Sequence, residues 1–199
     1  MNPPMDPSQR FDYQYNYAML FRLLFTIYIA VLATSQSSFG QNPWVNFAPT
    51  GENFVIEVPH AMKDGQKKIL TDVGELKPKT WICQGEKGDQ NHLYLLSYVD
   101  YPSDTFHPDS IQLIKDFLQA SLETHIHDLN GTLTYQSESP YITYPGILYR
   151  ASYNANHHVV KSRVILVNDR FYALQVYTNS EQSLNEDMNR FLHSFRIKS

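Results

Sequence analysis

Cysteine is nearly missing from this chain of 199 residues, and the shortage excludes two kinds of site. The one cysteine, Cys83, has no second thiol in the chain, so neither an internal disulfide framework nor a Cys-x-x-Cys metal or redox site can form. A hydrophobic core must therefore hold the fold together. Since 42% of the residues are hydrophobic, a domain of this size has enough of them to build one.

Positive charge is also scarce. The chain has 16 lysines and arginines against 20 aspartates and glutamates, a net charge of −4, and no segment concentrates the basic residues. A nucleic-acid-binding protein needs a row of cations to neutralise phosphates, so nucleic acid is not an expected partner. The 8 glycines and 11 prolines have no periodic spacing, which excludes collagen-like and low-complexity classes.

The signatures of several common enzymes are absent as well. The sequence has no Gly-x-Ser-x-Gly nucleophile elbow and no Ser-x-x-Lys. Gly85 and Gly88 flank Glu86-Lys87, but the Gly-Lys-Ser/Thr and the helix of a phosphate-binding loop do not follow. Cys83 falls in a predicted strand, where a free thiol acts as a small buried hydrophobe. No cofactor is therefore expected.

The longest apolar run lies near the N-terminus and predicts a secretory signal peptide. Leu23–Leu32 is apolar, Arg22 precedes it, and a small polar run follows it. The run is shorter than the roughly 20 residues of a membrane-spanning helix. Ser38 and Gly40 place small residues at the −3 and −1 positions of a cut between Gly40 and Gln41.

This segment sets the expected organisation of the chain. Residues 1–40 are predicted to be the leader, with an extended N-terminal part and an alternative true start at Met19, and residues 41–199 to be a single α+β domain. Cleavage would leave that domain secreted or periplasmic. In the alternative, the uncleaved segment anchors the domain to the membrane, and only then is a membrane contact expected.

Helix and strand patterns alternate along residues 41–199. The clearest helix is predicted from Pro108 to Ile126, because apolar residues recur there at steps of 3 and 4. A second helix is predicted from the capping-box pattern Ser183-x-x-Glu186 and an apolar stripe through Phe195. Strands are predicted at 54–58, 79–83, 93–99, 132–135, 146–151, 159–167 and 170–177.

The last two strands form a strong hairpin signal. The pair Asn168-Asp169 tolerates the positive φ of a two-residue turn, and in that register Leu166 faces Phe171 and Ile165 faces Tyr172. Both faces of the hairpin are then largely apolar, so each face needs a cover. We therefore expect a mostly antiparallel β-sheet flanked by helices on both faces.

Four segments carry a resemblance to a known family: Phe54–Pro59, Leu95–Pro102, Arg170–Val176 and Met188–Ile197. They resemble the PsbP-like (Ran-binding Mog-type) superfamily of α/β/α sandwiches, in small exported bacterial proteins, over residues 44–197. The resemblance implies this fold and an accessory or binding role. No functional motif of the family can be placed, so no functional residue is carried over.

Paired carboxylates give the only candidate for catalysis. Asp100 and Asp104 flank Tyr101-Pro102, and His107 follows closely, so this strand-to-helix loop is the richest polar cluster in the chain. A hydrolase-type enzyme would need these three side chains to meet in a pocket. In the alternative interpretation they only organise a turn before the helix, and we favour it.

Two histidines are weak candidates for metal ligands. On a helix, His125 and His127 are separated by about 200°, whereas chelating pairs need a spacing of four residues. His125 would lie beside Ile114 and Leu118, which favours a partly buried, hydrogen-bonded histidine. No metal is therefore expected unless the helix ends early and the two rings converge in a loop.

Tyr141 and Tyr144 are the best candidates for binding. They lie in a loop with Pro145 and Gly146 that has no evident core to fill, and tyrosine offers contact area with a polar end. We therefore expect an exported, non-enzymatic binding or accessory protein of the cell envelope, with an envelope or secreted protein as its partner. The alternative is a hydrolase centred on the loop from Asp100 to His107.

Overall fold

The computed structural model describes residues 44–66, 69–71, 74–76 and 78–198. The predicted leader and its cleavage site lie outside these residues. Among the described residues no helix is long and apolar enough to cross a membrane.

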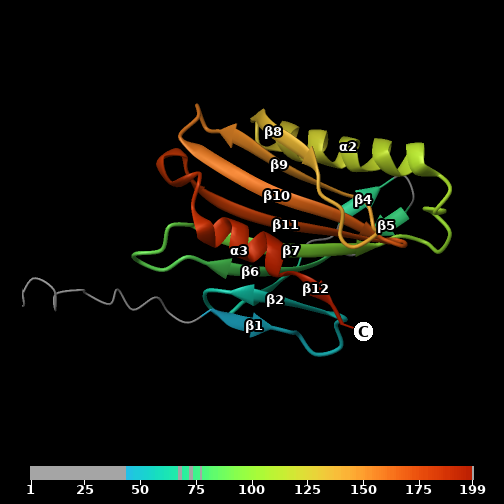
Figure 1. Cartoon of the computed structure of the whole chain (residues 1–199), viewed down its shortest axis with the longest axis horizontal. Coiled ribbons are helices and arrows are strands. Elements are labelled where there is room, and N and C mark those ends of the chain that lie inside the picture. Colours follow the sequence, from blue (N-terminus) through green and yellow to red (C-terminus); the bar gives the residue numbers. More distant parts are fainter. Residues whose placement is uncertain (1–43, 67–68, 72–73, 77, 199) are drawn as a thin grey trace, which may run out of the picture. The chain divides into compact units, whose positions relative to one another are not determined.

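A seven-stranded sheet forms the centre of the described chain (Figure 1). Every neighbouring pair in it is antiparallel, and the order is β3-β6-β7-β11-β10-β9-β8. The strands are β3 (Lys63–Gln66), β6 (Lys79–Gln84), β7 (Leu93–Asp100), β8 (Thr132–Glu138), β9 (Gly146–Tyr153), β10 (His158–Val167) and β11 (Arg170–Asn179). The predicted α+β class with a mostly antiparallel sheet is confirmed.

Shorter elements complete the fold. One three-stranded sheet has the order β1-β2-β12, and a separate pair joins β4 and β5. These strands and the helices are β1 (Val45–Phe47), β2 (Phe54–Val58), β4 (Ile69–Thr71), β5 (Gly74–Leu76), β12 (Arg196–Ile197), α2 (Ile111–Asp128), the 3₁₀ helix η1 (Ser180–Gln182) and α3 (Glu186–Ser194).

The hairpin of β10 and β11 has the predicted register. Leu166 pairs with Phe171 and Ile165 with Tyr172 across the turn, where Asn168 has φ 53°. Because strand side chains alternate between faces, this hairpin contributes to two separate cores. Ile165 and its neighbours belong to one, and Leu166 and its neighbours to the other.

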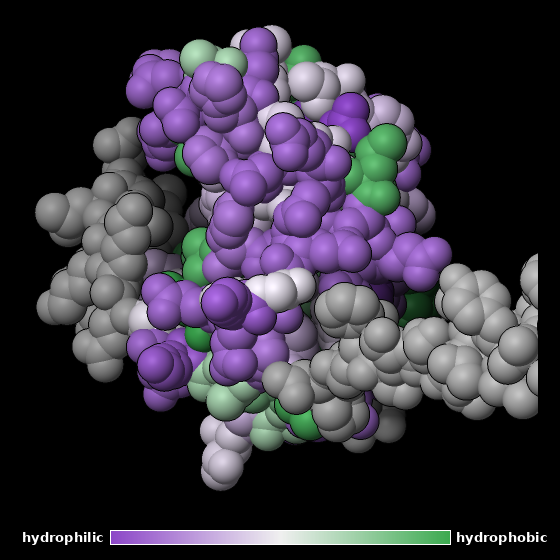
Figure 2. All heavy atoms as spheres, turned by 90° about the vertical axis from the view of Figure 1, so that its left-hand side faces the viewer, coloured by the Kyte–Doolittle hydropathy of each residue, from purple (hydrophilic) through white to green (hydrophobic). Residues whose placement is uncertain are grey.

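The two core clusters are named here by the helix in each. The α3 cluster joins the sheet to β2 and α3, through residues such as Phe54, Leu174 and Phe191. The α2 cluster joins the sheet to α2, through residues such as Leu118, Leu122 and Val164. Hydrophilic side chains cover most of the visible surface in Figure 2, with hydrophobic ones in small groups between them.

Both helices begin later than the sequence pattern predicts. Pro108 is not in the first turn of α2, because the Ser110 N–H donates to the His107 carbonyl at 2.8 Å and closes a turn before the helix. The cap of α3 is Asn185 rather than Ser183: its side chain accepts a hydrogen bond from the Met188 N–H at 2.9 Å. Leu184, predicted on the apolar stripe, is 86% exposed because it precedes the helix.

Candidate functional site

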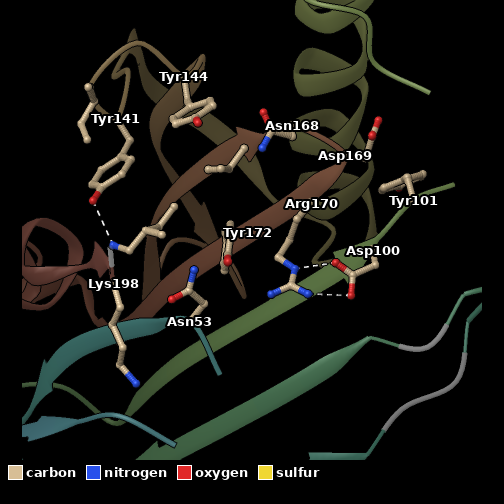
Figure 3. Close-up of a pocket in the computed structure, with 13 residues that line it drawn as sticks. Asn53, Asp100, Tyr101, Tyr141, Tyr144, Asn168, Asp169, Arg170, Tyr172 and Lys198 are labelled. Atoms are coloured by element: carbon tan, nitrogen blue, oxygen red, sulfur yellow. Dashed lines mark hydrogen bonds and ion pairs between the residues drawn. The ribbon is translucent and has the colours of Figure 1, made fainter. Parts of the chain in front are cut away.

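A cavity of about 690 Å³ lies beside the β10–β11 turn (Figure 3). Its volume falls within the roughly 300–1,000 Å³ of small-molecule sites. Segments far apart in the sequence line it: the hairpin turn with Arg170 and Tyr172, the end of β7 with Asp100, the 141–144 loop, and Asn53 with Lys198. The site therefore forms only in the tertiary fold, and no local sequence motif predicts it.

An ion pair crosses one wall of the cavity. Asp100 and Arg170 are directly opposed on β7 and β11, and two hydrogen bonds join them, Nε to Oδ1 at 2.5 Å and Nη2 to Oδ2 at 2.9 Å. The guanidinium also lies 4.0 Å from the ring centre of Tyr98. The Asp100 carboxylate raises the pKa of Arg170. Arg170 is therefore a fixed cation, and both oxygens of Asp100 are engaged.

The other two candidates for catalysis do not line this cavity. At Asp104 the backbone N–H donates to the Asp169 carboxylate at 3.1 Å, which closes a turn. The His107 ring faces Asp109 instead, with Nδ1 and Oδ2 3.5 Å apart, and its side chain is exposed. Only Asp100 of the three lines the cavity. A hydrolase centred on this loop would need the three side chains to meet in one pocket, and they do not.

Both predicted binding tyrosines line the cavity, and they are also packed on the core. Tyr141 and Tyr144 exchange two backbone hydrogen bonds of 2.9 Å, so the loop is a tight two-residue hairpin. Both rings pack on the α3 cluster, and the Tyr141 hydroxyl accepts a hydrogen bond from the Ile197 N–H at 2.9 Å. The expectation that this loop has no core to fill is therefore wrong: the chain end and α3 provide it.

Ile142 stands at the tip of this loop in a strained conformation. Its φ is 56°, a region where a β-branched residue is rare, and the residue is 78% exposed. It lines the cavity together with the two tyrosines. An apolar side chain is thus held at the mouth of a polar and aromatic cavity.

His125 and His127 do not meet. His125 is partly buried, with its ring nitrogens 2.7 Å from the Tyr149 hydroxyl and 3.1 Å from the Tyr177 hydroxyl. His127 is exposed beside Asp128. The hydrogen-bonded histidine predicted at 125 is therefore confirmed. In the described part of the chain, no group of three or more His, Cys, Asp or Glu side chains is placed to hold a metal ion.

Comparisons with known proteins bear on the fold. No protein-family model matches the chain, and no curated protein matches it. Among solved structures, that of cyanobacterial PsbP (CyanoP) from Synechocystis sp. PCC 6803 is similar, with a TM-score of 0.51. The match covers 82% of this chain and 97% of that one at 12% identity. The fold is PsbP-like.

The similar structure confirms the PsbP-like fold that the sequence resemblance implied. At 12% identity the likeness shows the fold alone, so the cavity has to be judged on its own residues. Sequence reasoning found Asp100, Tyr141 and Tyr144 but missed Arg170, Asn53 and Lys198. The turn before Arg170 could be predicted, whereas its pairing with a strand 70 residues earlier could not.

Proposed function

We propose that this protein is an exported binding or accessory protein of the cell envelope, acts without catalysing a reaction, and holds its partner at the cavity beside Arg170. The observation that carries the proposal is the exposed, strained Ile142 at the mouth of that cavity. Strained residues persist only where the surrounding structure holds them, and they cluster at binding sites. The engaged carboxylate of Asp100 supports binding rather than catalysis.

We also propose that helices cover both faces of the sheet, as in an α/β/α sandwich. This arrangement would give the cavity two rigid layers beneath it. The membership of α2 and α3 in different core clusters supports this arrangement. Sites built on rigid elements position their contacts better than sites on free loops.

A photo-crosslinking amino acid at Ile142, introduced into the full chain in its native source, tests the binding role. The matched control is the same amino acid at Leu184, which is as exposed but precedes α3 and does not line the cavity. We expect a defined protein adduct from position 142 only. The adduct should be lost when Tyr144→Ala is combined with the crosslinker at position 142, in a protein that still unfolds cooperatively. Equal adducts from both positions, or none from either, would contradict the proposal.

Export is tested separately by N-terminal sequencing of the protein isolated from the same source. A mature chain that begins at Gln41 in the envelope or culture fluid supports the cleaved leader. A chain that retains residues 19–40 in the membrane fraction supports the anchor instead. An intact N-terminus in the cytosolic fraction would overturn the proposed location.

A further inference from the structure

The sheet continues beyond α3 on the face that this helix covers. Helix α3 contacts β2, β10 and β11. The next strands on that side are β9 and the edge strand β8, seen above α3 in Figure 1. Most residues of β8 are exposed. Side chains of β8, β9 and β10 therefore form the solvent-facing surface of this part of the sheet.

Cations gather there although the whole chain is acidic. Arg150 on β9 and Lys161 on β10 are directly opposed, Arg163 follows on the same face, and His193 lies in the last turn of α3. We call Arg150, Lys161 and Arg163 the cation face. Arg150 donates to the Thr134 hydroxyl at 3.2 Å and Lys161 to the Asn189 amide oxygen at 2.6 Å.

None of these contacts neutralises a charge. Among the described residues, no carboxylate lies within ion-pair distance of Arg150, Lys161 or Arg163, although seven other basic side chains in the same part of the chain have one. Burial, and to a smaller extent Arg150, lowers the pKa of Lys161. Burial, and to a smaller extent Arg163 and Lys161, lowers the pKa of His193. Arg150 and Lys161 therefore repel each other, and Arg163 and Lys161 disfavour the charged form of His193.

Arg163 makes this repulsion costly to the fold. It is only 7% exposed, and its guanidinium donates to the Leu192 carbonyl at 3.3 Å and the Pro140 carbonyl at 2.9 Å. Its Nε has no hydrogen-bond partner within the described chain. The end of a helix attracts a cation, but a buried guanidinium without a carboxylate remains undercompensated. An anion arriving at this face would relieve it.

A β-bulge adds an aromatic side chain to the cation face. The pairing of β8 with β9 shifts between Leu133 and Tyr135, so that Thr134 is extra and Tyr135 lies opposite Arg150. In an unbroken register Thr134 would occupy that place. Tyr135 is exposed there beside the cations. Arginine and tyrosine are the residue types that protein interfaces favour.

We infer that the cation face, together with Tyr135, is a docking surface for an acidic segment of another protein. The cations are few, whereas a nucleic acid needs a longer row of them. A carboxylate-bearing segment meets Arg150 and Lys161 with matching charge and meets Tyr135 with apolar area. This surface is distinct from the cavity, so the two proposals stand separately.

The test measures fluorescence anisotropy of a fluorescein-labelled Glu-Ala repeat peptide with the full chain at low and high salt. We expect salt-sensitive binding that Arg150→Gln with Lys161→Gln weakens about tenfold. Lys63→Gln with Lys87→Gln removes the same charge from exposed positions away from this face and is expected to change binding less than about twofold. Arg150→Lys with Lys161→Arg keeps the charges and should retain binding.

Thermal unfolding of each variant confirms that it is folded before binding is compared. The inference is overturned if the wild-type chain does not bind the peptide at low salt, or if both charge-removing pairs weaken binding equally. Duplex DNA and phosphatidylglycerol vesicles are the comparison ligands. Should either bind as tightly as the peptide and lose binding in the Arg150 and Lys161 variant, the surface is one for polyanions in general and the assignment to an acidic protein segment fails.

Discussion

His125 is held in its neutral form by its surroundings. Two tyrosine hydroxyls, of Tyr149 and Tyr177, lie at hydrogen-bond distance from its ring, and the Gln175 amide nitrogen is 3.3 Å from Nε2. Burial lowers the pKa of His125 below its ordinary 6.5 and outweighs the opposite effect of Asp128. A charged ring would lose solvent and disturb a network that joins α2 to β9 and β11.

The stability of the fold should therefore fall in mild acid. Because the folded-state pKa of His125 is lowered, the unfolded chain binds the proton first, and the stabilisation is complete above pH 6.5 and declines as the pH falls below it. We expect His125→Gln to reduce the difference in melting temperature between pH 7.5 and pH 5, while His127→Gln, at an exposed position, leaves it unchanged. An identical pH dependence in all three chains would contradict this role.

Ile142 gives a second prediction at the scale of a residue. Its positive φ costs about 1–2 kcal/mol, whereas asparagine adopts this conformation readily. Ile142→Asn should raise the free energy of unfolding by about 1 kcal/mol in urea titrations, since little apolar area is buried there. Thr143→Asn, at the neighbouring position without a positive φ, should change it by less than about 0.5 kcal/mol. A loss of stability in Ile142→Asn would show that the tip is not strained.

Local elements could be predicted from the sequence where the deciding contacts are local. The β10–β11 hairpin was predicted with its register because the turn pair and the apolar residues of both strands lie within one short segment. The start of α3 could not be decided in this way. Serine and asparagine are equally good caps, and Asn185 is selected by Asn91, whose side chain exchanges two hydrogen bonds with it from 94 residues away.

This pairing can be tested on α3. Asn185→Ala removes the cap of the helix and leaves the buried Asn91 amide with the Tyr94 hydroxyl but without its two hydrogen bonds to Asn185, so we expect a loss of about 2 kcal/mol in the free energy of unfolding. Ser183→Ala, at the position that the capping-box pattern selects, should cost less than about 0.5 kcal/mol. Equal losses in the two variants would contradict the assignment of the cap to Asn185 rather than Ser183.

On the scale of the whole molecule, the reactivity of the Cys83 thiol shows whether the α3 cluster is closed to solvent. The side chain is 0% exposed, and burial raises the pKa of its thiol. A thiol reagent such as DTNB should therefore not label the native protein and should label it fully in guanidinium chloride. Asn185→Ala is expected to speed labelling under native conditions, because α3 covers this cluster. Rapid labelling of the wild-type chain would contradict the closed core.

The candidate site was only partly predictable for a reason that also belongs to the whole molecule. Tyr141 and Tyr144 stand out as aromatic residues in a short loop, and Asp100 stands out as the end of a strand. Their common cavity depends on Arg170, Asn53 and Lys198, which come from other parts of the chain. No periodicity or motif links residues that only the completed sheet brings together.

The pairing of β7 with β11 has a consequence for the order of folding. On one side of this seam β6 and β7 are neighbours along the chain, and on the other β8, β9, β10 and β11 follow one another, so each half can assemble from nearby residues. The seam itself must close a long loop, since Asp100 and Arg170 are 70 residues apart, and such contacts form slowly. The cavity takes residues from both halves. A partner that recognised this cavity would therefore bind only chains that have finished folding.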